Sequence, residues 1–127
     1  MFIVDTHAWI EYFEGSKKAE KLHHLLLNEA NEFFTIECCL AEIKGWTLRK
    51  SKDVSAVLSI VRANSRVIGV NEQDWLDAAE IRFEQRKSQK NFGLIDAILL
   101  AKQKEFRFKI ISGDYHFKNL KNVIFLE

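Results

Sequence analysis

The chain has 127 residues, 47% of them hydrophobic, which is enough for a packed core and predicts a single domain over residues 1–127. Its 19 basic and 18 acidic residues leave a formal net charge of +1, so net charge alone does not predict a nucleic-acid partner. The adjacent Cys38 and Cys39 exclude a disulfide framework and indicate reduced thiols. No signal-like or membrane-spanning run is visible, so we expect a cytoplasmic protein without a membrane segment.

Short apolar runs alternate with longer amphipathic segments along the first half of the chain. The predicted elements are a strand over Phe2–Val4, a helix over His7–Phe13 capped by Thr6, a helix over Lys17–Ala30, a strand over Phe33–Ile36, a helix over Cys38–Lys50 and a helix capped by Asp53. Gly15 is expected to end the first helix.

The second half continues the same alternation. Its predicted elements are a strand over Val67–Val70, a helix that begins after Asn71 and runs to about Lys90, a buried helix over Leu94–Phe106, and strands over Phe108–Ser112 and Val123–Leu126. This order predicts an α/β fold, a three-layer α/β/α sandwich with a central parallel five-stranded sheet. Ligands of such folds bind at the carboxyl ends of the strands, and Asp5 and Asp114 each follow a strand directly.

Four carboxylates stand out from the others, although each also has a structural interpretation. Asp5 could cap a helix, and Asp114 could be a turn residue. Asp96 lies in the first turn of an apolar helix, where a carboxylate favours the helix dipole, and its apolar neighbours leave it in need of a partner. Glu42 could be an ordinary exposed helical residue beside Lys44.

Taken together, the four carboxylates predict a metal site. Four acids at one sheet edge would repel each other, and some would have to be protonated unless a cation were present. Mg²⁺ and Mn²⁺ take oxygen ligands, and Mg²⁺ commonly uses substrate phosphate oxygens as further ligands. The candidate ligands are all carboxylates and include no His or Cys. Such a ligand set favours phosphate-ester chemistry over zinc peptidase chemistry.

At this point the chain resembles the PIN-domain family. The segment Phe2–Ile10 resembles the opening strand of these proteins, Gly93–Ala101 their central acidic helix, and Ile110–Leu120 their last acidic segment. Glu42 matches the acid expected on the helix after the second strand. The resemblance covers essentially the whole chain in the right order, and single-domain members of this size are mostly VapC-like toxins.

The resemblance implies a toxin of a type II toxin–antitoxin pair that hydrolyses RNA phosphodiesters with metal-activated water. It implies Asp5, Glu42, Asp96 and Asp114 as catalytic and metal-binding residues, Mg²⁺ as the cofactor with Mn²⁺ able to substitute, and adjacent first and fourth strands. It also implies a homodimer, a small cognate antitoxin as partner, and the Thr6 and Ser112 hydroxyls beside the metal.

Basic side chains are needed for RNA to approach an acidic pocket. The candidate RNA contacts are Arg49, Lys50, Arg82, Arg86, Lys87 and Lys90, although cations at solvated helix ends are an equally ordinary interpretation. His7 and His116 lie close to acids in the sequence but are interpreted as structural residues.

Two other functions stay open. A phosphatase of the haloacid-dehalogenase type also has an Asp after its first strand, but it normally needs a second Asp two residues later, where this chain has His7. A PIN-like fold can also be a non-catalytic module that binds RNA or protein, but the presence of all four acids argues against it.

Overall fold

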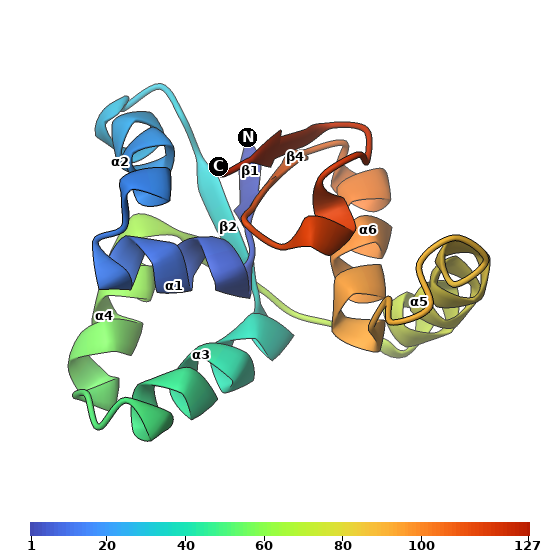
Figure 1. Cartoon of the computed structure of the whole chain (residues 1–127), viewed down its shortest axis with the longest axis horizontal. Helices are drawn as coiled ribbons and strands as arrows, with labels where there is room; N and C mark the ends of the chain where they lie inside the picture. The colour runs from blue at the N-terminus through green and yellow to red at the C-terminus, as the bar shows by residue number, and fades with distance from the viewer.

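The computed structural model describes residues 1–127 and contains one sheet of five parallel strands (Figure 1). The strands are β1 (Phe2–Val4), β2 (Phe33–Ile36), β3 (Arg66–Ile68), β4 (Lys109–Ser112) and β5 (Val123–Phe125). Their order across the sheet is β3-β2-β1-β4-β5. The chain therefore turns to the other side of β1 when it reaches β4, and parallel α/β sheets bind ligands at such a reversal of strand order.

Six α-helices and two short 3₁₀ helices connect the strands. They are α1 (Thr6–Glu14), η1 (Lys17–Ala19), α2 (Glu20–Leu27), α3 (Glu37–Arg49), α4 (Val54–Asn64), α5 (Glu72–Gln85), α6 (Leu94–Phe106) and η2 (Tyr115–Phe117). Helices α1 to α4 lie on one side of the sheet, and α5 and α6 lie on the other (Figure 1). None of these helices has both the length and the apolar character needed to cross a bilayer.

Two apolar cores, one on each face of the sheet, hold the three layers together. Neighbouring residues of one strand point to opposite faces, so Ile3 joins the core under α5 and α6 while Val4 joins the core under α1 to α4. The parallel register places Ile3 beside both Phe34 and Ile110, all three of them buried in the first core. The predicted three-layer fold, with β1 and β4 adjacent, is confirmed.

Several predicted helix boundaries were wrong. The helix expected over Lys17–Ala30 is split into η1 and α2 and ends at Leu27. Beyond that point, side chains form hydrogen bonds with backbone groups in place of further helix. Asn28 accepts from the Ala30 amide at 3.0 Å, and Asn31 donates to the Leu25 carbonyl at 3.0 Å. Helix α5 ends at Gln85, not near Lys90.

The turn after α5 is fixed by side-chain hydrogen bonds instead of further helix. Arg86 Nε donates to the Phe92 carbonyl at 2.8 Å, and Gln89 Nε2 donates to the His116 carbonyl at 3.0 Å. The buried Phe92 anchors this turn in the core. The turn therefore brings η2, which follows β4, close to the first turn of α6.

Candidate active site

A cavity of about 370 Å³ opens at the carboxyl ends of β1 and β4. All four carboxylates singled out from the sequence line it. The complete lining is Asp5, Thr6, His7, Ile10, Ala41, Glu42, Gly45, Arg49, Asp96, Leu99 and Asp114. Residues from four distant segments of the chain therefore meet at the predicted edge of the sheet.

Asp5 is the most buried of the four acids, with 3% of its surface exposed. Its backbone amide donates to the Ile111 carbonyl of β4 at 3.1 Å, and its side chain accepts from the Ala8 amide at 2.7 Å. Asp5 is thus the N-cap of α1, as its structural interpretation from the sequence allowed, and the cap assigned to Thr6 was wrong. Burial raises the pKa of Asp5 to about 7, opposed by hydrogen bonds from Ser112 and Ala8 and supported by repulsion from Asp114 and Asp96.

Asp114 follows β4 and is the N-cap of η2, where its Oδ1 accepts from the His116 amide at 2.9 Å. Its own amide donates to Ser112 Oγ at 2.9 Å. Ser112 is fully buried, and its hydroxyl also acts to lower the pKa of Asp5. The Ser112 hydroxyl therefore lies close to both strand-end acids.

Asp96 lies in the first turn of α6, where its Oδ2 accepts from the Gly93 amide at 3.2 Å. Burial raises its pKa, and the charges of Asp114 and Glu42 act in the same direction. The Gly93 amide and His116 oppose the rise. Asp114 and Glu42 lie on other elements, and their charges therefore repel the ionised form of Asp96.

Glu42 reaches the cavity from α3 and is exposed. Thr6 Oγ1 donates to Glu42 Oε1 at 2.6 Å, which ties the first turn of α1 to α3. Because Asp5 caps α1, the Thr6 hydroxyl is free to orient this fourth carboxylate. The sequence placed Thr6 beside the site through the family resemblance, and the structure shows which acid it contacts.

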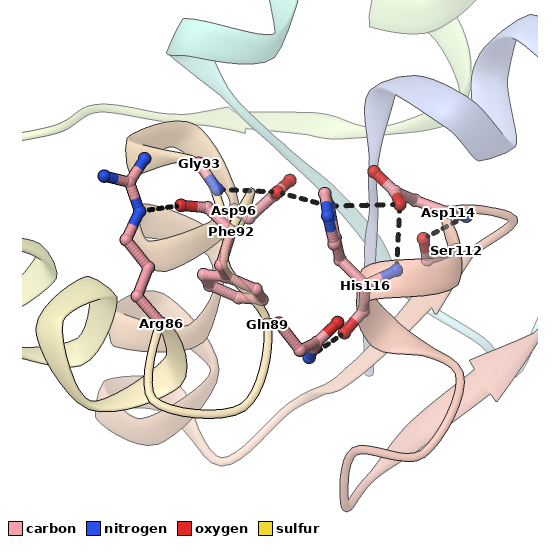
Figure 2. A network of polar contacts seen from close by, with 8 residues as sticks. All are labelled: Arg86, Gln89, Phe92, Gly93, Asp96, Ser112, Asp114 and His116. Atoms are coloured by element: carbon pink, nitrogen blue, oxygen red, sulfur yellow. Dashed lines mark hydrogen bonds and ion pairs between the residues drawn. The ribbon is translucent and has the colours of Figure 1, made fainter.

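His116, interpreted from the sequence as a structural residue, lies against two of the four acids. Its Nδ1 lies 3.1 Å from Asp96 Oδ2 and 3.4 Å from Asp114 Oδ1, so the ring stands between the two acids (Figure 2). Ligand atoms of Asp96, Asp114 and His116 all lie within 4.8 Å of one another. Its position two residues after Asp114 was the only signal in the sequence, and that signal says nothing about Asp96, which lies on another element.

The donor set fits a divalent cation. Carboxylate oxygens are the ligands that Mg²⁺ and Mn²⁺ prefer, and the acids converge in one cavity. Burial and mutual repulsion raise the pKa values of Asp5 and Asp96, and a bound cation would remove that repulsion and favour their ionised forms.

The predicted RNA contacts are divided between two places. Arg49 lines the cavity itself. Arg82, Arg86 and Lys87 line a separate hollow around the exposed Phe83 on α5, where Lys87 also pairs with Glu84 at 3.1 Å. Lys50 and Lys90 are exposed and line neither of these two hollows.

The sequence model of the PIN-domain family matches residues 2–123 of the chain. The chain belongs to the PIN-domain family. No curated protein matches its sequence. The family match spans β1 to the start of β5, so it includes every acid of the cavity.

Solved structures share the fold of this PIN domain at low sequence identity. A VapBC2 complex from Rickettsia felis bound to a promoter DNA fragment has a TM-score of 0.72 and 18% identity, with 98% of this chain and 96% of the other covered. The VapC20 toxin of Mycobacterium tuberculosis, described as cleaving the sarcin–ricin loop, has a TM-score of 0.71 and 18% identity, with coverage of 91% and 89%. A toxin–antitoxin complex from Klebsiella pneumoniae has a TM-score of 0.69 and 19% identity, with coverage of 100% and 98%.

Proposed function

We propose that this PIN-domain protein is a Mg²⁺-dependent endoribonuclease and the toxin of a type II toxin–antitoxin pair. The observation that carries the proposal is the convergence of Asp5, Glu42, Asp96 and Asp114 on one cavity at the carboxyl edge of the sheet. Two of these acids have raised pKa values because they are buried among other acids, an arrangement typical of functional sites.

Asp5, Asp96 and Asp114 would hold the cation, with Glu42 contributing directly or through water. When bound, Mg²⁺ or Mn²⁺ would supply Lewis-acid activation of water and neutralise charge on the phosphodiester. The protein's part is to fix the acids in place. Ala8 and Ser112 hold Asp5, Gly93 holds Asp96, and Thr6 holds Glu42. Such preorganisation lowers the reorganisation needed in the reaction.

Arg49 is the basic residue best placed to contact RNA, because it lines the same cavity as the acids. A guanidinium can bind a phosphate through two parallel hydrogen bonds, which would orient the scissile group against the carboxylates. The hollow lined by Arg82, Arg86 and Lys87 is a second candidate RNA contact, away from the cavity lining.

The toxin role draws on the relatives, whose structures include toxin–antitoxin complexes. By analogy we propose a small cognate antitoxin as partner, a homodimer as the working form, and a cytoplasmic location. The alternative of a non-catalytic PIN module is weakened because all four acids line one cavity. The haloacid-dehalogenase alternative is weakened by the family match over residues 2–123.

Cleavage of RNA by the antitoxin-free protein is expected in Mg²⁺ and in Mn²⁺, and its loss is expected in EDTA with recovery when the metal is restored. The products should carry 5′-phosphates and 3′-hydroxyls. The assay should include single-stranded DNA and a phosphate monoester as parallel substrates. Unchanged cleavage in EDTA would contradict the proposal. Release of phosphate from the monoester without RNA cleavage would favour the phosphatase, and RNA binding without cleavage in any metal would favour the non-catalytic module.

A further inference from the structure

The His116 side chain is held firmly against the acids of the site. Its backbone amide donates to Asp114 Oδ1 at 2.9 Å, and its carbonyl accepts from Gln89 Nε2 at 3.0 Å. Its ring packs in an edge-to-face manner with the fully buried Phe92, with ring centroids 5.6 Å apart and an interplanar angle of 62°. Figure 2 shows the result, an imidazole directed at both Asp96 and Asp114. The ring is therefore positioned before any ligand arrives.

The Nδ1 atom of this ring is buried and forms no hydrogen bond. The nearest oxygen, Asp96 Oδ2, lies at 3.1 Å, but that contact does not meet hydrogen-bond geometry. Nδ1 therefore has two carboxylates within ion-pair distance but no well-formed hydrogen bond, whereas native structures satisfy nearly all buried polar atoms. An imidazole nitrogen and two carboxylates facing one another form a set that a single cation could satisfy at once.

We propose that Nδ1 of His116 is a direct ligand of the divalent cation, together with Asp96 and Asp114. This inference rests on the proposed function for the cation itself and adds a nitrogen ligand to an otherwise all-oxygen site. Mg²⁺ is a hard ion that favours oxygen, whereas transition-metal ions accept imidazole readily. His116 therefore shifts the selectivity of the site from Mg²⁺ toward ions such as Co²⁺ and Mn²⁺.

A different role for His116 makes the opposite prediction. A protonated imidazole between two carboxylates would instead be a counter-ion that neutralises Asp96 and Asp114 and occupies the place of the metal. Its removal would then strengthen metal binding. A ligand role predicts weaker binding after removal, so the sign of the change separates the two roles.

The test is electron spin-echo spectroscopy of Mn²⁺ bound to the protein, which reports nitrogen atoms coordinated to the ion. We expect the wild-type protein to show ¹⁴N modulation. Labelling with ¹⁵N-histidine should replace it with a ¹⁵N pattern, and this comparison needs no amino-acid substitution. The His116→Ala variant should lose the modulation. The matched control is His7→Ala, because His7 lines the same cavity but is exposed, and it should keep the modulation.

Metal affinities provide the second readout. His116→Ala is expected to lower Co²⁺ affinity by about 10–100-fold and Mg²⁺ affinity by less, with His7→Ala close to wild type. Wild-type protein whose Mn²⁺ shows no nitrogen coupling, or a His116→Ala variant that binds Co²⁺ as tightly as wild type or more tightly, would overturn the inference. Oxygen-only metal binding with intact RNA cleavage would overturn it and leave the proposed function standing. Nitrogen-ligated metal without RNA cleavage would support it and overturn the proposed function.

Discussion

Replacing Asp5 with asparagine is expected to stabilise the metal-free protein by about 2–4 kcal/mol at pH 8. The pKa of Asp5 rises from 3.8 to about 7 on folding because the carboxyl is buried. Each pKa unit corresponds to about 1.4 kcal/mol, so ionised Asp5 opposes folding by up to about 4 kcal/mol. Asparagine removes the charge, and its side-chain oxygen can still accept from the Ala8 amide as the N-cap of α1.

The expected gain depends on pH in a defined direction. Below about pH 3, Asp5 is protonated in both the folded and the unfolded chain, so the variant and the wild type should be similarly stable. Between about pH 4 and pH 7 the wild type loses stability relative to the variant, because the unfolded chain ionises first. Above about pH 7 the difference should be constant.

Urea unfolding in EDTA at several pH values measures this difference. The control is Asp53→Asn, because Asp53 is also a helix N-cap, accepting from the Ala56 amide at 3.1 Å, but it is exposed. That variant should stay within about 0.5 kcal/mol of wild type. Added Mg²⁺ should stabilise the wild type and not Asp5→Asn. A metal-free Asp5→Asn protein that is less stable than wild type at pH 8 would contradict the account of Asp5.

Replacing Lys102 with methionine is expected to destabilise the fold by about 3–5 kcal/mol. Lys102 Nζ on α6 lies 2.7 Å from Asp74 Oδ2 on α5, and the two side chains are only 4% and 7% exposed. Burial opposes ionisation of both groups, but the ion pair and the hydrogen bonds around it hold the pKa of Asp74 below its usual value and that of Lys102 above it. Without the ammonium, Asp74 would be a buried charge with no cationic partner.

The ion pair matters to the site because it fixes α5 against α6, the helix that carries Asp96. Thermal or urea unfolding measures the loss, with Lys104→Met as the control, since Lys104 is exposed on the same helix. The double variant Asp74→Asn/Lys102→Met should recover much of the stability, because asparagine can still accept from the Asn71 amide. A Lys102→Met protein within about 1 kcal/mol of wild type would show that the buried pair contributes little.

The position of the acids at the strand ends could be predicted from the sequence, whereas most contacts between elements could not. Asp5 and Asp114 follow apolar runs that predict buried strands, so their place at the carboxyl edge follows from the parallel fold. The start of α5 after Asn71 was also predicted from the sequence. The structure shows a capping box there, formed by the side chains of Asn71 and Asp74, which lie within one helical turn.

Contacts that depend on packing could not be predicted in this way. Whether Asp5 or Thr6 caps α1 depends on the path of the chain as it leaves β1, and Thr6 instead reaches Glu42, 36 residues further along. His116 approaches Asp96 only because the turn that Gln89 and Phe92 anchor packs against η2. Three of the candidate RNA contacts, Arg82, Arg86 and Lys87, lie at the end of α5 and line a different hollow from the acids.

The most direct test of the central claim is the single-turnover rate of RNA cleavage by Asp96→Asn in Mg²⁺, measured beside the wild type. Asparagine can still accept from the Gly93 amide at the start of α6, so the fold should be retained while a charged metal ligand is lost. We expect the rate to fall by at least about 100-fold, and an exposed-acid control, Asp77→Asn on α5, to cleave like wild type. A folded Asp96→Asn protein that cleaves RNA at nearly the wild-type rate would contradict the assignment of catalysis to this cavity.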